Sequence, residues 1–396
     1  MVNNTVDVRG VDSGDDKGAS DPWYTRTPDQ EQMAAATRGF VRHHAPLRTL
    51  RQDREREKGG SEPSPDGEQL WRLMCNQLGG PAIAIPEEYG GLGMGLEEVC
   101  ALLEEAGAEL AFPYLLPMLG QVIPLLIEGA ESPIASTMLQ DIARGIRVVG
   151  LAWLDRHGEP FTNSIRGRLS DGGWRLDGTA ALVVEAAVCD DFLVVAQVDD
   201  GWRLFAVQAA APTVRVSNPQ SIDPTREVFD VTFDNSVGLE IGFAGDIRPA
   251  IQRAQDVAAV CLGAEQLGGA VRCLQLALEY ASARHQFDRP IAAFQALQHM
   301  CADAHIANEA ARSVLYYATW AEGEGSTEFP LAASAAKVAC SEAFVRAASL
   351  NIQIHGTIGF TDEDLAQRYY RRAKWSYLYG GSPSYHRSRI AELLEV

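Results

Sequence analysis

Two clusters of residues in the C-terminal half of the chain have the types and spacing of a phosphate-binding site. Arg284, Phe287 and Gln295 follow the pattern R-H-Q-F-(x7)-Q. The arginine ends a long helical segment, so its planar guanidinium can reach a neighbouring subunit and hold a pyrophosphate through two hydrogen bonds. Further along, Q-I-H-G-T supplies Gln353 and Gly356, and a glycine allows the backbone to approach a phosphate closely. Arg284 taken alone would be assigned to a surface ion pair, for example with Glu279 or another carboxylate.

The segments that must position these clusters change character twice along the 396 residues. Residues 1–28 are rich in Asp, Gly, Ser and Asn and are predicted to form a disordered leader. Residues 29–146 have mostly helical periodicity, whereas residues 147–240 contain about six short runs rich in Val, Phe and Trp that are separated by Asp-containing turns. Residues 241–396 are helical again, in four long segments at 258–282, 292–320, 331–354 and 364–378. We expect an α+β protein with an N-terminal helical domain, a middle antiparallel β domain and a C-terminal four-helix bundle.

Composition narrows the classes of function. The formal net charge of −19 disfavours nucleic acid and anionic membrane surfaces as partners. The seven cysteines are scattered and form no CxxC pair, which argues against a disulfide framework and a metal site and fits a reducing cytoplasm. The N-terminus lacks the apolar segment of a signal peptide. The apolar run at 110–127 contains three prolines, so we expect a buried hairpin there and no membrane span.

Three segments, residues 85–110, 279–303 and 351–375, resemble the flavin-dependent acyl-CoA dehydrogenases in their order and spacing. The strand-rich middle region matches more weakly between them, so the resemblance covers roughly residues 30–396. It implies FAD as cofactor, an acyl thioester as substrate, an electron-transfer acceptor and an oligomeric assembly. The glycines of GGLGMG (residues 90–95) lack the GxGxxG register and a surrounding βαβ unit, and we interpret them as a tight turn between helices.

The resemblance also assigns roles to single residues. Matching positions in the family make Arg284, Phe287 and Gln295 contacts of the FAD of an adjacent subunit, and Gln353 and Gly356 contacts of its ADP half. Ser382 and Ser384 fall where the family contacts the flavin.

Three departures from the family pattern stand beside these matches. Asp288 and Thr357 replace residues that are usually glycine, and Asp288 adds a negative charge near the expected pyrophosphate unless it points away or pairs with Arg289. The usual flavin-ring motif is missing after AWLD. Thr162 and Ser164 in the sequence that replaces it could offer hydroxyls to the flavin, but hydroxyls are common in turns and we expect these two to be solvated.

The family's catalytic carboxylate is absent from both of its known positions. The usual place after the RRAK-like segment is Gly380, and the alternative place on the first bundle helix is Ala258. Asp256 lies two residues from the latter, about 200° around the helix, and Glu265 lies two turns further on. Gly380 keeps the backbone N–H that donates to the thioester carbonyl in the family. His355 and His386 are the nearest imidazoles, and we expect neither to be the base, because a histidine beside a helix end is usually solvated. We interpret Cys261, Cys273 and Cys301 as core residues and not as nucleophiles.

Empty base positions and a lost flavin-ring motif are similar to one subunit of the actinobacterial acyl-CoA dehydrogenases that act on steroid side chains. Those enzymes are α2β2 heterotetramers in which one of two unlike chains supplies the carboxylate. We therefore expect FAD-dependent α,β-dehydrogenation of an acyl-CoA or acyl-carrier thioester, within a homo- or hetero-oligomer with a family paralogue. Three alternatives remain open: a self-sufficient enzyme with an unrecognised base, a flavin monooxygenase on the same fold, and a non-catalytic partner subunit.

Overall fold

The computed structural model describes residues 26–44 and 67–395, apart from residues 130, 159, 163, 220, 244 and 362. Most of the predicted leader therefore lies outside the described residues. The N-terminal helices pack around one apolar core that continues under the sheet and into the C-terminal helices. They are α1 (Pro28–His44), α3 (Gly67–Leu78), α4 (Leu96–Ala108), α5 (Leu115–Pro117), α6 (Ile123–Glu128) and α7 (Pro133–Ala143), with short 3-10 turns at Gly80–Ala84 and Glu87–Tyr89.

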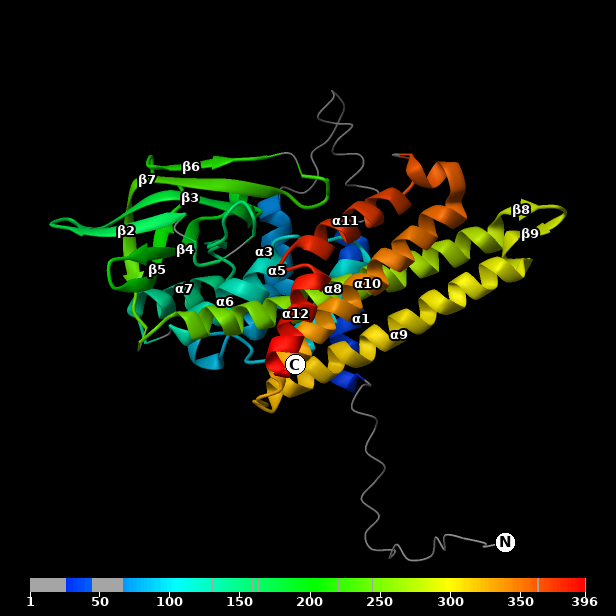
Figure 1. The fold of residues 1–396 in the computed structure, drawn as a ribbon, viewed down its shortest axis with the longest axis horizontal. Helices are drawn as coiled ribbons and strands as arrows, with labels where there is room; N and C mark the ends of the chain where they lie inside the picture. The colour runs from blue at the N-terminus through cyan, green and yellow to red at the C-terminus, as the bar shows by residue number, and fades with distance from the viewer. Residues whose placement is uncertain are drawn as a thin grey trace, which may run out of the picture.

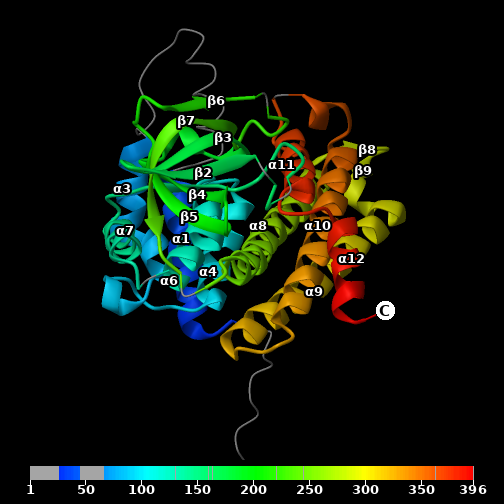
Figure 2. The same cartoon turned by 60° about the vertical axis from the view of Figure 1, so that its left-hand side comes forward.

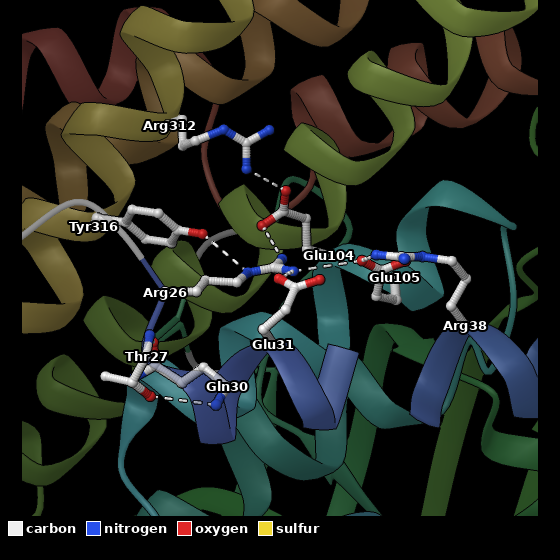
Figure 3. A network of polar contacts seen from close by, with 9 residues as sticks. All are labelled: Arg26, Thr27, Gln30, Glu31, Arg38, Glu104, Glu105, Arg312 and Tyr316. Atoms are coloured by element: carbon white, nitrogen blue, oxygen red, sulfur yellow. Dashed lines mark hydrogen bonds and ion pairs between the residues drawn. The ribbon is translucent and has the colours of Figure 1, made fainter. Parts of the chain in front are cut away.

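A buried polar network fixes the start of the described chain (Figure 3). The guanidinium of Arg26 donates to Glu104 on α4 at 2.7 Å and to the Tyr316 hydroxyl at 3.1 Å. The other oxygen of Glu104 accepts from Arg312 at 2.5 Å, while Arg38 on α1 holds Glu105 in two bonds of 2.7 and 2.8 Å. Arg26 was predicted to belong to the leader, but its pairing with a buried carboxylate makes it part of the folded domain.

The proline-containing run at 110–127 is not the hairpin that the sequence suggested. Residues 110–114 form a turn, and a mostly buried helical segment follows, in which a π-helical turn at Met118–Val122 joins α5 to α6. The wider turn accommodates Pro124, which has no N–H and whose ring would crowd a preceding carbonyl in a regular α-helix.

The glycine-rich stretch 90–95 is a turn before α4, as expected. Gly90 has a φ of 83°, and a Cβ on Gly91 would lie 2.0 Å from the carbonyl oxygen of Ile85. The glycines are needed for the close backbone path and not for a phosphate.

The middle domain is a seven-stranded sheet (Figure 1). β3 pairs antiparallel with β2 and β7, and β5 pairs antiparallel with β4 and β7, as expected. β1, however, runs parallel to β4, and β2 meets β4 in a parallel bridge, so the sheet is mixed. Strand direction depends on the path of the loops between strands, which alternation of apolar residues does not encode. The strands are β1 (Val149–Ala152), β2 (Ile165–Ser170), β3 (Gly173–Val184), β4 (Asp191–Val198), β5 (Gly201–Gln208), β6 (Val214–Ser217) and β7 (Val228–Ile241).

Long helices build the C-terminal domain and run side by side away from the sheet (Figures 1 and 2). Helix α8 (Arg248–Ala283) begins ten residues before the segment predicted from the sequence and is the central helix of the domain. By length and composition it would be long and apolar enough to cross a membrane, but 83% of its most apolar window is buried inside the protein. The remaining elements are the hairpin β8 (His285–Gln286) and β9 (Arg289–Pro290), α9 (Gln295–Gly323), α10 (Phe329–His355), α11 (Ala366–Leu378) and a fifth helix, α12 (Pro383–Leu393).

Candidate functional site

The predicted cofactor residues fall into two groups. The first, which we call the distal group, lies where α8 and α10 end beside each other, as the stacking of Tyr280 on His355 at 4.2 Å shows. All of its members are exposed. They are Arg284, Phe287, Gln295, Gln353 and Gly356.

A tight hairpin presents the aromatic member of the distal group. Phe287 and Asp288 form the two-residue turn between β8 and β9 with φ values of 54° and 61°, and Phe287 is 85% exposed. A turn with two positive φ angles favours Gly, Asn or Asp, which explains how Asp288 replaces the usual glycine. No ion pair joins Asp288 to Arg289 in the described part of the chain, and the Arg289 guanidinium lies 4.1 Å from the ring centroid of Phe294.

The distal group suits a phosphate ligand. Glu279, the partner proposed for Arg284 in a surface ion pair, instead faces Arg272 at 3.5 Å. Within the described residues the Arg284 guanidinium has no ion pair. Gly356 has a φ of 65°, and nothing lies within 4 Å of the place where a Cβ would be, so its backbone is open to a ligand. These residues therefore fit the pyrophosphate of FAD approaching from outside the chain.

The second group surrounds a turn at Tyr379–Ser382, which we call the 380 turn. Gly380 is exposed and lies beside Leu262 of α8, 3.8 Å from the position of a Cβ. Ala258, one helical turn before Leu262, touches the π-helical turn: a Cβ on Gly120 would lie 3.0 Å from the Ala258 Cα. The two base positions known in the family therefore converge on one region of this chain, and both lack a carboxylate.

The two groups are far apart within one chain. Leu262, next to the 380 turn, and Arg284 are separated by 22 residues of the same helix. At 1.5 Å per residue this is about 33 Å. The distal group therefore lies at the C-terminal end of α8, whereas the 380 turn lies beside the middle of that helix, and the two groups do not form one compact site within this chain.

The two serines predicted to contact the flavin, Ser382 and Ser384, differ in their surroundings. Ser382 caps α12, and its Oγ accepts from the Tyr385 N–H at 3.3 Å, whereas Ser384 is exposed on the first turn of that helix. In the replaced flavin-ring segment, the Thr162 hydroxyl is buried and has no hydrogen-bond partner within the described residues. The expectation of a solvated hydroxyl is therefore wrong for Thr162, and a buried hydroxyl without a partner is compatible with a ligand at this segment.

Asp256 is occupied by an ion pair and does not point to the base position as a free carboxylate. It is 2% exposed and is paired with Arg389 of α12. Burial raises the pKa of Asp256, and the charge of Arg389 opposes that rise. Since a base must be able to reach the substrate Cα, a carboxylate tied to an arginine on another helix is structural.

Glu265 belongs to a buried quartet of charges, with Asp223, Arg226 and Arg372. Its Oε1 accepts from Arg226 at 2.7 Å and from Arg372 at 2.5 Å, and Arg372 also pairs with Asp223. The guanidinium of Arg226 additionally lies 4.8 Å from the ring centroid of Trp375. The quartet ties the loop before β7 to α8 and α11 and carries no net charge.

Neither candidate histidine has a free imidazole that could act as the base. His355 lies in the distal region, and its Nδ1 is 2.8 Å from the Asn351 carbonyl. His386 is buried under the 380 turn with Nε2 2.9 Å from the Gly380 carbonyl. Burial lowers the pKa of His386 to about 4, so it is neutral at pH 7 and donates from Nε2.

The cysteine thiols are structural. All seven are free, and Cys261, Cys273 and Cys301 lie in the helical core as predicted. Burial raises the pKa of each of these three thiols, which removes the thiolate needed for nucleophilic attack. The described residues contain no group of three or more His, Cys, Asp or Glu side chains suited to a metal ion.

Comparison with known proteins identifies the family. The model of the acyl-CoA dehydrogenase N-terminal domain matches residues 27–145, and that of the C-terminal domain matches residues 249–394. Acyl-CoA dehydrogenase IpdE2 of Mycobacterium tuberculosis is 32% identical over 352 residues, which cover 88% of this chain and 92% of the relative. The chain belongs to the acyl-CoA dehydrogenase family. Its resemblance to that family, its class as an oxidoreductase acting on CH–CH bonds, and FAD as the family's cofactor are thereby confirmed.

Two further relatives of this acyl-CoA dehydrogenase chain are informative. Acyl-CoA dehydrogenase FadE27 of M. tuberculosis is 33% identical over 350 residues, covering 83% of this chain and 88% of the relative. A chain of the ChsE4–ChsE5 complex of M. tuberculosis superposes with a TM-score of 0.79 at 26% identity, covering 94% of this chain and 98% of that one. The expected layout of helices, β domain and helices is thus the fold of the family.

Proposed function

We propose that this chain is the base-less member of a heteromeric acyl-CoA dehydrogenase that desaturates an acyl-CoA or acyl-carrier thioester at its α,β bond. The main support for this proposal is that both base positions, Gly380 and Ala258, lack a carboxylate. The two nearest candidates along α8, Asp256 and Glu265, are both buried in ion pairs with arginines. A family paralogue supplies the carboxylate that takes the Cα proton.

The division of labour follows from the position of the two groups of residues. When bound, FAD accepts the hydride from Cβ and passes the electrons to an electron-transfer acceptor. The distal group of this chain holds the pyrophosphate and ADP half of a cofactor that lies mainly on the neighbouring chain. The 380 turn offers its N–H to a thioester carbonyl. The similarity to a chain of the ChsE4–ChsE5 complex supports an assembly of unlike chains, and the acidic composition with scattered free cysteines supports a cytoplasmic location.

The test compares the chain alone with the chain co-expressed with a paralogue that retains a carboxylate. We expect the pair to sediment as a stable oligomer, to contain FAD by absorbance and to form enoyl thioester, whereas the chain alone forms none. A monomer with full activity would overturn the proposal. Oxygen consumption that depends on NADPH, without enoyl product, would assign the chain to the flavin monooxygenases instead.

A second measurement separates a catalytic partner from a purely structural one. If the distal group holds FAD, the variant Arg284→Ala lowers the FAD content of the pair. Unchanged FAD and unchanged turnover after this substitution would make the chain a non-catalytic partner subunit.

A further inference from the structure

Helix α11 ends just before the 380 turn, and its last carbonyl groups need partners from elsewhere. The Tyr379 N–H donates to the Trp375 carbonyl at 3.1 Å, after which the Tyr379 backbone turns to an extended conformation with ψ of 139°. In a continuing helix the next bond would run from the Gly380 N–H to the Ser376 carbonyl. That bond is missing, and the Gly380 N–H has no hydrogen-bond partner within the described residues.

Two buried side chains take the place of the missing backbone donor. The Ser376 carbonyl accepts from Lys337 Nζ of α10 at 3.0 Å and from Gln266 Nε2 of α8 at 3.0 Å. The Ser341 hydroxyl closes the arrangement, since it accepts from Lys337 at 2.9 Å and donates to Gln266 Oε1 at 3.1 Å. Lys337 is 0% exposed and has no carboxylate partner among the described residues, so its main polar contacts are this carbonyl and this hydroxyl.

The other side of Gly380 is held independently. Its carbonyl accepts from His386, and a Cβ on the following Gly381 would lie 2.9 Å from the same imidazole nitrogen. Gly380 itself has a φ of 68° and is exposed. The peptide groups on both sides of the turn are therefore anchored, whereas the N–H of Gly380, an exposed residue, has no partner within the described parts of the chain.

We propose that Lys337 and Gln266 are positioning residues for the acyl site: by capping the Ser376 carbonyl they keep the Gly380 N–H free to donate to the carbonyl oxygen of an acyl thioester. This inference rests on the proposed function, because it takes the thioester as the ligand. A donor fixed in advance stabilises the negative charge that develops on that oxygen when a base removes the Cα proton. This stabilisation of the thioester oxygen is the same whether the carboxylate that removes the proton belongs to a partner chain or to this chain.

The sequence allows this N–H to be observed alone. Only Tyr89–Gly90 and Tyr379–Gly380 are Tyr–Gly pairs, so labelling tyrosine carbonyls with ¹³C and glycine amides with ¹⁵N gives two signals in a carbonyl-filtered NMR spectrum. The Gly90 N–H donates to the Glu87 carbonyl at 2.9 Å and is the bonded internal reference. The measurement uses the full-length deuterated chain, alone or in its co-purified assembly with only this chain labelled.

In the wild-type chain we expect the Gly380 amide to exchange with solvent at least tenfold faster than that of Gly90. In Lys337→Met, or in Gln266→Met if the first variant does not fold, the uncapped Ser376 carbonyl recruits the Gly380 N–H. Its exchange then slows about tenfold, the effect of one hydrogen bond of about 1.4 kcal/mol. Lys374→Met is the matched control, because Lys374 lies over the Tyr370 ring and, among the described residues, forms no hydrogen bond or ion pair with the turn. Slow exchange of the Gly380 amide in the wild type would overturn the inference. An exchange rate that stays at the wild-type value in both capping variants would overturn it as well.

Addition of butyryl-CoA and octanoyl-CoA then separates the inference from the proposed function. A downfield shift of the wild-type Gly380 amide proton, reduced in the capping variants, supports both. If Lys337→Met slows the exchange of the Gly380 amide but neither thioester shifts its proton signal, the capping is supported and the acyl site is contradicted.

Discussion

The buried quartet gives a sharp prediction about Glu265, the carboxylate that sequence spacing places on the same face of α8 as Ala258. Glu265→Gln removes one of the two negative charges of the quartet, so that Asp223 is the quartet's remaining carboxylate beside Arg226 and Arg372, each 1% exposed. Breaking a buried ion pair from one side leaves an uncompensated charge, and this typically costs about 3–5 kcal/mol. We therefore expect the free energy of unfolding to fall by about that amount, a large part of the 5–15 kcal/mol of a typical domain.

Urea unfolding followed by circular dichroism measures this loss, with Glu279→Gln as the control at an exposed ion pair, where we expect less than about 0.5 kcal/mol. The double variant Glu265→Gln/Arg226→Met should recover at least about 2 kcal/mol, because Arg226 carries two buried nitrogens without partners in the described structure. Turnover per folded assembly should stay within about twofold of the wild type. A small change in stability together with loss of turnover would refute the structural role and make Glu265 the base.

Three other predictions follow from the same physical arguments. Burial lowers the pKa of Lys337 to about 7, so between pH 7 and 8.5 the unfolded state holds a proton that the folded state lacks, and stability rises with pH. In Lys337→Met this contribution, about 1.4 kcal/mol per pH unit, should disappear from urea-unfolding curves, and identical pH slopes would contradict it. Glu104→Gln should destabilise the chain by about 3 kcal/mol, whereas exposed Glu31→Gln, 3.6 Å from Arg26, should have little effect in the same thermal unfolding assay. Arg284→Ala should weaken FAD retention by about 1.5–3 kcal/mol without changing the melting temperature, with exposed Arg168→Ala as the control; equal FAD content in the two variants would count against a cofactor role for Arg284.

Periodicity and composition were sufficient for the order of the elements but not for their directions. Ala-rich segments nearly free of internal Gly or Pro identified the long C-terminal helices, since period-3.6 patterns report one buried face. The parallel pairing of β1 with β4 depends on where intervening loops lead the chain, and alternation carries no such information. The prolines at 113, 117 and 124 suggested a hairpin because a π-helical turn, which accommodates a proline within a helical segment, has no simple sequence signal.

The site was only partly visible in the sequence. The empty base positions and the distal group could be located from motif spacing, and the structure adds that the former lie beside the middle of α8 and the latter at its C-terminal end. The sequence did not predict the buried quartet or the capping of the Ser376 carbonyl by Lys337. The presence of a charged residue does not reveal whether its side chain contacts water or a distant segment of the chain. A signal did exist: Lys337 interrupts the otherwise uncharged stretch AASAAKVACS, where a surface lysine would usually be accompanied by other polar residues.

The central claim is that the base acts from another chain, and anaerobic bleaching of bound flavin on mixing with acyl-CoA tests it most directly. In the co-purified pair, replacing the paralogue's carboxylate by glutamine should slow bleaching by about 10²–10⁴-fold, the usual worth of positioned proton transfer. Asp256→Asn in this chain should leave the rate per bound flavin within about twofold. Rapid bleaching by this chain alone, or by the pair after the paralogue has lost its carboxylate, would contradict the account.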